Sequence, residues 1–167
     1  MYPDCIMAST YQINFKNYYE KGYRGVIFDI DNTLVPHGAE ADEKSIRLFK
    51  ELKELGFQTI LLSNNKEHRV KSFNKSIETN YIFKAGKPGK SNYYKAIKQM
   101  GTSIQNTLFV GDQLFTDILG AKRVGIYSIL VEPIHPKEEI QIVLKRYLEK
   151  IVLFFYCRQI KKKGEKV

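Results

Sequence analysis

"VIFDIDNTLVP" (residues 26–36) begins as an apolar, β-branched run and then places two aspartates two residues apart. Such a run is typical of a strand that is buried on both faces of a parallel sheet. Alternation along the strand puts Asp29 and Asp31 on the same side of the chain. Two carboxylates this close repel each other, so a metal ion, a proton or both must accompany them. The stretch therefore predicts a buried strand that ends in a chemical site.

Strand and helix patterns alternate along the rest of the chain. Strands are predicted over residues 25–30, 57–63, 81–85, 107–112 and 126–131. Helices are predicted over residues 41–55, 66–77, 91–101 and 114–124, with a short one in NYYEKGY (residues 17–23) and a last one from Pro136 to about Cys157. This order predicts an α/β fold, a Rossmann-like three-layer sandwich with a five-stranded parallel sheet. We interpret residues 1–167 as one domain, with an N-terminal extension (1–24) and a C-terminal helix and basic tail (137–167).

Charge and cysteine content narrow the class of protein. The net charge of +9 and the pI of about 9.4 favour anionic partners such as phosphate esters, nucleic acid or an acidic membrane surface, although a basic surface without a partner fits as well. Cys5 and Cys157 form no disulfide framework, which favours a reducing compartment. MYPDCIMAST (1–10) lacks the features of a signal peptide, and the apolar run 151–157 is far shorter than the ~20 residues of a membrane span. We therefore expect a cytoplasmic protein.

Polar residues follow each of the next three predicted strands. The second strand ends in SNN (63–65), the third is followed by GKPGK (86–90), and the fourth ends in GDQLFTD (111–117). Each motif alone is also compatible with a turn, a helix cap or a solvated basic loop. In an open parallel α/β sheet, however, ligands bind at the carboxyl ends of the strands. All of these motifs lie at such ends, so they predict one common site.

The motifs DIDNT, SNN, KP and GDxxxTD, in this order, resemble those of the haloacid dehalogenase (HAD) superfamily of phosphohydrolases. The resemblance covers residues 24–132. FDIDNTLVPHGAEAD and VGDQLFTDILGAKRVGIYSILVEP are similar, more narrowly, to the bacterial YqeG-type proteins of subclass IIIA, which are similar to mitochondrial phosphatidylglycerophosphate phosphatases.

The resemblance implies a role for each motif residue. Asp29 would be the nucleophile that forms an aspartyl-phosphate, and Asp31 the general acid and base. The other implied roles are phosphate binding by Ser63, Asn64 and Lys87, charge neutralisation by Lys87, and Mg²⁺ binding by Asp29, Asp112 and the backbone carbonyl of Asp31. Asp117 would orient a water ligand or Lys87, and Thr33 would hold the turn.

The spacing of the motifs bears on the substrate. Residues 32–62 and 64–86 have room for a helix and a strand each, and neither segment can hold a cap domain of the kind found in many HAD proteins. An open site suits substrates attached to something large, such as a lipid surface, a nucleic acid end or a protein. The helix predicted after Pro136 carries an apolar stripe with basic residues between. This helix either packs on the sheet, which we favour, or makes peripheral contact with anionic lipid.

The leading hypothesis is a Mg²⁺-dependent phosphatase of phosphatidylglycerophosphate, or of a similar phospholipid, at the cytoplasmic face of the membrane. The first alternative is a phosphatase of soluble sugar, nucleotide or polynucleotide-end phosphates, although we find no nucleic-acid recognition motif. A mutase or phosphotransferase would use the same chemistry. The other alternative is a non-catalytic binding protein on a HAD fold, against which the complete set of motif residues argues. The sequence does not predict an oligomeric state.

Overall fold

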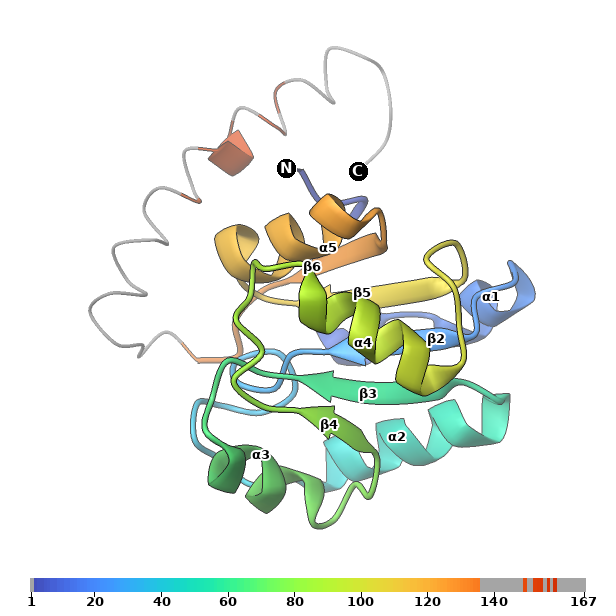
Figure 1. Cartoon of the computed structure of the whole chain (residues 1–167), viewed down its shortest axis with the longest axis vertical. Helices are drawn as coiled ribbons and strands as arrows, with labels where there is room; N and C mark the ends of the chain where they lie inside the picture. Colours follow the sequence, from blue (N-terminus) through green and yellow to red (C-terminus); the bar gives the residue numbers. More distant parts are fainter. Residues whose placement is uncertain (1, 136–148, 150–151, 155, 157, 159–167) are drawn as a thin grey trace.

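The computed structural model describes residues 2–135, 149, 152–154, 156 and 158 (Figure 1). In these residues, one parallel sheet has the strand order β1-β6-β5-β2-β3-β4. The strands are β1 (Cys5–Met7), β2 (Gly25–Phe28), β3 (Gln58–Leu62), β4 (Asn80–Ile82), β5 (Thr107–Gly111) and β6 (Tyr127–Val131). The strand that carries the opening motif, β2, lies between β3 and β5. The carboxyl ends of the parallel strands meet at one edge of the sheet.

The helices alternate with the strands as the sequence predicts. They are α1 (Phe15–Glu20), α2 (Glu43–Leu55), α3 (Glu67–Asn74), α4 (Ser91–Met100) and α5 (Leu119–Val124), with a 3₁₀ helix at Thr10–Gln12 and a π-helical turn at Leu114–Ile118 directly before α5. Local signals set the ends of α2. The Asp42 side chain accepts a hydrogen bond from the Ser45 backbone at 2.8 Å, and Gly56 ends the helix with a φ of 93°.

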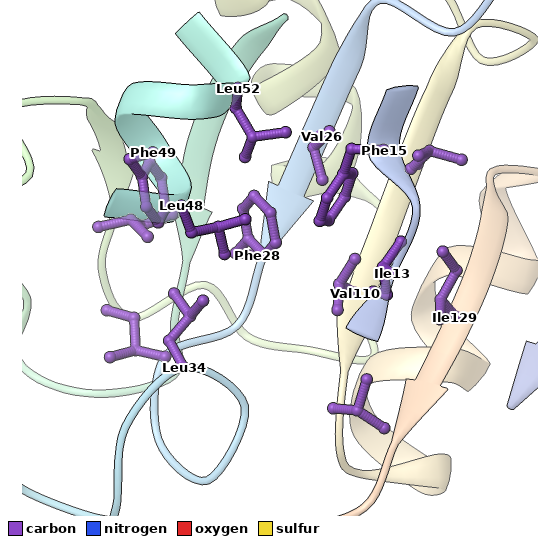
Figure 2. Packing of buried hydrophobic residues seen from close by; sticks show 14 of the residues in the cluster. Ile13, Phe15, Val26, Phe28, Leu34, Leu48, Phe49, Leu52, Val110 and Ile129 are labelled. Atoms are coloured by element: carbon purple, nitrogen blue, oxygen red, sulfur yellow. The ribbon is translucent and has the colours of Figure 1, made fainter. Parts of the chain in front are cut away.

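Helices cover both faces of the sheet, which confirms the three layers. On one face, Phe28 of β2 packs with Phe15 of α1, Leu52 of α2 and Phe73 of α3 (Figure 2 shows the first three). On the other face, side chains of β2, β3 and β5 pack against α4 and α5. The strands contribute Ile27, Ile60 and Phe109, and the helices contribute Tyr93, Ala96 and Ala121. Each central strand therefore buries alternate side chains on opposite faces, as its continuous apolar run requires.

The prediction of five strands was wrong, because the N-terminal extension adds a sixth. β1 pairs with β6 at the edge of the sheet. Asp4, just before β1, anchors it by accepting hydrogen bonds from the Ser128 backbone N–H at 2.8 Å and from the Ser128 hydroxyl at 2.9 Å. Only three residues pair, so β1 is too short to show a periodic pattern in the sequence.

Most of the predicted C-terminal helix and tail lies outside the described residues. Some of the described residues of this segment pack on the protein. Val152 and Leu153 contact the cluster of Leu114, Ile118 and Leu130, and the Tyr156 hydroxyl donates a hydrogen bond to the Pro3 carbonyl at 2.9 Å. Among the helices that the structure describes, none combines the length and the apolar character needed to cross a bilayer.

Candidate active site

A cleft of about 210 Å³ opens at the carboxyl ends of the strands, where the sequence predicts the site. The predicted residues Asp29, Asp31, Ser63, Asn64, Lys87 and Asp117 line it, together with His37, Asn65, Gln113 and Thr116. Asp112 and Thr33 are buried beside this group. The structure thus brings all the predicted site residues into one region. Asn65, Gln113 and Thr116 lie within the motifs SNN and GDQLFTD, but the sequence predicted no individual role for them.

The loop after β2 is a tight turn that buries its polar side chains. The Asp29 backbone N–H continues the pairing with β5 by donating to the Val110 carbonyl at 3.0 Å. Asn32 takes a left-handed conformation with a φ of 61°, and its N–H donates to the Val35 carbonyl at 2.7 Å. Asparagine tolerates this conformation better than most residues. The turn brings Val35 alongside Asp31 in the parallel direction, and both aspartates line the cleft.

Lys87 joins two of the carboxylates. Its ammonium nitrogen lies 2.6 Å from Oδ1 of Asp29 and 2.7 Å from Oδ1 of Asp117, and its side chain is only 3% exposed. The loop that carries it is held by Asn64, whose side-chain oxygen accepts the Lys87 N–H at 2.8 Å and whose amide donates to the Lys87 carbonyl at 3.2 Å. Asn64 therefore positions Lys87 with its side chain. Its contact with phosphate stays a prediction.

Asp31 points toward α3. Arg69 of that helix donates to its Oδ1 from Nη2 at 2.9 Å and from Nε at 3.3 Å. The Gly38 N–H also donates to Oδ1, at 2.8 Å, and the Asn65 amide donates to Oδ2 at 2.5 Å. Sequence reasoning missed Arg69, because an arginine on the helix that follows a motif is more often a solvated surface residue.

Three buried carboxylates form a group that fits a hard cation. Asp29, Asp112 and Asp117 each offer an oxygen within 4.8 Å of the others. Thr33 donates a hydrogen bond to Oδ1 of Asp112 at 3.1 Å, which holds that carboxylate in place. Carboxylate oxygens are the ligands that Mg²⁺ and Ca²⁺ prefer. Lys87 also contacts two of the three, so a cation here would share Asp29 and Asp117 with the ammonium group.

The electrostatics of the site also fit a cation. Burial raises the pKa of Asp29 to about 7, although the attraction of Lys87 works in the opposite direction. Burial alone would lower the pKa of Lys87, but the attraction of Asp117 and Asp29 outweighs it and raises this pKa. Lys87 therefore stays charged, while the ionised form of Asp29 needs more positive charge than Lys87 supplies. A divalent cation would supply that charge.

Comparison with known proteins assigns the family. A model of the haloacid dehalogenase-like hydrolases matches residues 37–125. The Bacillus subtilis (strain 168) protein named "Probable phosphatase YqeG" is 33% identical over 163 residues, which are 97% of this chain and 92% of that protein. The chain belongs to the haloacid dehalogenase-like hydrolase family. This hydrolase is an enzyme of the phosphatase type.

Two further kinds of relative add detail. "Phosphatidylglycerophosphate phosphatase 1, chloroplastic/mitochondrial" of Arabidopsis thaliana is 28% identical over 150 residues, which are 78% of this chain but only 43% of that longer protein. A HAD-superfamily hydrolase from Ehrlichia chaffeensis superposes with a TM-score of 0.55 at 15% identity, over 77% of this chain and 97% of that one. The cobalt-bound deoxy-D-mannose-octulosonate 8-phosphate phosphatase of Haemophilus influenzae gives 0.55 at 15% identity, over 66% of this chain and 69% of that one. These structural matches confirm the HAD-like α/β fold of the hydrolase.

Proposed function

We propose that the protein is a Mg²⁺-dependent phosphomonoester hydrolase that works through an aspartyl-phosphate on Asp29. The observation that carries the proposal is the position of Asp29. It ends the central strand β2, lines the cleft, contacts Lys87 at 2.6 Å and shares a carboxylate group with Asp112 and Asp117. A carboxylate can attack an anionic phosphate only where positive charge offsets the repulsion. Lys87 and a bound cation would supply that charge.

The reaction runs in two displacements. In the first, a carboxylate oxygen of Asp29 bonds to phosphorus, the bond from phosphorus to the alcohol oxygen breaks, and Asp31 gives that oxygen a proton. In the second, Asp31 takes a proton from water, the water oxygen bonds to phosphorus, and the bond to Asp29 breaks. Inorganic phosphate leaves and both aspartates return to their starting states. Ser63 and the backbone of Asn64 would bind the phosphoryl oxygens.

The metal would be held by Asp29, Asp112 and the backbone carbonyl of Asp31, and when bound it supplies positive charge to the phosphate oxygens. Asp117 contacts Lys87 at 2.7 Å, which supports the proposed role of orienting that lysine. Thr33 donates to Asp112 at 3.1 Å and so holds a ligand rather than reacting.

For the substrate we propose phosphatidylglycerophosphate or a similar phospholipid. The Arabidopsis relative bears that substrate in its name, although this chain spans less than half of its length. The segments between the motifs are occupied by α2 with β3 and by α3 with β4 and so carry no cap domain, which would suit a head group that stays in a membrane. A net charge of +9 favours an anionic surface. The proposal places the enzyme in the cytoplasm, in peripheral contact with the inner face of the membrane.

The test is phosphate release from phosphatidylglycerophosphate in mixed micelles, beside a panel of soluble sugar, nucleotide and polynucleotide-end phosphates. Mg²⁺ is supplied or removed with EDTA, and Asp29→Asn serves as the blank. We expect release that needs Mg²⁺, favours the lipid and disappears in Asp29→Asn while the fold is kept. Equal turnover of soluble esters would remove the lipid assignment and leave the phosphatase. Turnover by pure Asp29→Asn would refute the mechanism.

A further inference from the structure

Arg69 of α3 has a side chain that is largely buried, which is unusual for an arginine on a helix at the protein surface. Its side chain is 13% exposed and that of its partner Asp31 is 11% exposed. Among the described residues, Nη1 of Arg69 is buried and has no hydrogen-bond partner. A guanidinium group gains more from water than from such a setting unless a strong partner compensates it. The aromatic ring of Phe73, 5.9 Å away, adds only a weak contact. The partner that compensates is the Asp31 carboxylate.

The contact leaves the two oxygens of Asp31 in different surroundings. Oδ1 receives both hydrogen bonds from Arg69 and one from the Gly38 N–H. Oδ2 receives one neutral hydrogen bond, from the Asn65 amide. The donors come from α3, from the loop after β2 and from the loop after β3, so together they set both side-chain torsions of Asp31. His37, whose Nδ1 lies 3.9 Å from Oδ1, is too far away to replace Arg69.

The two aspartates of the DID motif are thus paired with different positively charged side chains. Lys87 contacts Asp29 and Asp117, at 2.6 and 2.7 Å, and Arg69 contacts Asp31 at 2.9 Å. Without Arg69, the Asp31 carboxylate would keep only the neutral donors Gly38 and Asn65 among the described residues, and these would fix its orientation less firmly. Arg69 therefore holds Asp31, which transfers the proton, apart from Asp29, which attacks phosphorus.

We propose that Arg69 is a positioning residue, which fixes Oδ1 of Asp31 and leaves Oδ2 as the oxygen that transfers the proton. This inference rests on the proposed function. In the first displacement, the proton on Oδ2 passes to the leaving alcohol oxygen. In the second, Oδ2 accepts a proton from the attacking water. Arg69 is not among the residues that line the cleft, so it acts through Asp31.

Substrates whose leaving groups differ in acidity can show whether Arg69 acts by positioning Asp31, the proposed proton donor. An alkyl phosphate needs a proton on its leaving oxygen, whereas an aryl phosphate with an acidic phenol leaves without one. Single-turnover release of alcohol or phenol, with Mg²⁺ saturating, isolates the first displacement. We expect Arg69→Met to slow the alkyl phosphate by roughly 100-fold and the aryl phosphate by less than about 5-fold, with KM little changed. Arg69→Lys keeps the charge but loses the bidentate contact, so its rate with the alkyl phosphate should lie between those of the wild type and Arg69→Met.

The control variants make the result decisive. Arg47→Met removes an exposed arginine on α2 and should behave as the wild type. In the Asp31→Asn background, Arg69→Met should add no further loss, because a residue that acts through Asp31 has nothing left to position. The inference would be overturned if Arg69→Met slowed the alkyl and aryl phosphates equally. It would also be overturned if Arg69→Met slowed the Asp31→Asn variant by the same factor as the wild type. If Arg69→Met does not fold, the selective loss in Arg69→Lys decides the question by the same criteria.

Failure of the inference can be told apart from failure of the proposed function. If Asp29→Asn abolishes turnover while Arg69→Met leaves the alkyl rate intact, the aspartyl-phosphate mechanism stands and the role of Arg69 falls. If Asp29→Asn still releases phosphate, the mechanism falls first, and the Arg69 inference falls with it.

Discussion

Lys87 is the residue on which the charge balance of the nucleophile depends. Its buried ammonium group lies within 2.7 Å of oxygens of Asp29 and Asp117. A buried ion pair adds little net stability compared with an apolar replacement of the whole pair, but removing one partner leaves an unpaired charge in the interior. The side chain therefore matters for folding as well as for the proposed chemistry.

We predict that Lys87→Met lowers the free energy of unfolding by about 3 kcal/mol in metal-free protein and abolishes phosphate release. Urea unfolding at neutral pH measures the first effect. Lys90→Met, which removes an exposed lysine of the same loop, is the matched control and should change the free energy of unfolding by less than about 0.5 kcal/mol. A loss below about 1 kcal/mol in Lys87→Met would show that the buried carboxylates do not need this partner.

The raised pKa of Asp29 predicts competition between protons and metal. With a pKa of about 7, metal-free Asp29 is mostly protonated at pH 6 and mostly ionised at pH 8. Because a metal ligand must give up its proton, apparent Mg²⁺ affinity should rise with pH, by about tenfold from pH 6 to pH 8. Calorimetry in buffers of different ionisation enthalpy should detect close to one proton released per Mg²⁺ at pH 6 and almost none at pH 8.

Asp29→Asn is the control for this titration, because its amide has no proton to release. Any Mg²⁺ binding that it keeps should release no proton from this position at pH 6. The same number of released protons at pH 6 and pH 8 in the wild type would contradict the prediction.

At the scale of elements, α4 supports the turn that carries Asp117. Tyr93 of α4 is fully buried, and its hydroxyl donates to the Asp117 carbonyl at 3.0 Å, with the Thr116 carbonyl at 3.3 Å. These carbonyls lie in the π-helical turn Leu114–Ile118, where the ordinary helical pairing is interrupted. Tyr93 thus satisfies a backbone group that the interruption affects and ties α4 to the site.

We predict that Tyr93→Phe lowers the free energy of unfolding by about 1–2 kcal/mol, because it leaves a buried carbonyl without its donor. Tyr94→Phe is the matched control: the neighbouring tyrosine is 47% exposed and should tolerate the change. Equal stability of the two variants in urea unfolding would argue against a supporting role for Tyr93.

At the scale of the whole molecule, an open cleft lies on a protein of net charge +9. Such a charge attracts anionic substrates over distances set by the ionic strength and speeds their encounter. We predict that kcat/KM for a dianionic phosphate ester falls several-fold from about 50 to 500 mM NaCl, while kcat changes little. Initial rates at saturating Mg²⁺ test this, and a zwitterionic ester of similar size should show a weaker salt dependence. A kcat/KM independent of salt would exclude steering by this charge.

The part of the site that lies within single motifs was predictable from the sequence. Asp29, Asp31, Ser63, Lys87, Asp112 and Asp117 follow or end buried strands, and the parallel sheet brings those ends together. Contacts between motifs were not predictable. Arg69 reaches Asp31 across 38 residues, and Thr33 reaches Asp112 across 79. Neither pairing follows from a periodic pattern, because each depends on how far one element lies from another.

By itself, the sequence determined the alternation of strands and helices, the family motifs and the end of the sheet where they gather, because apolar periodicity and strand direction are local properties. Only the tertiary structure decided the strand order, the addition of β1 at the edge, and which cation serves which aspartate. These depend on packing between segments distant in the chain. Side-chain contacts of this kind form only after the layers assemble, so their partners are set by distances in space rather than by spacing in the sequence.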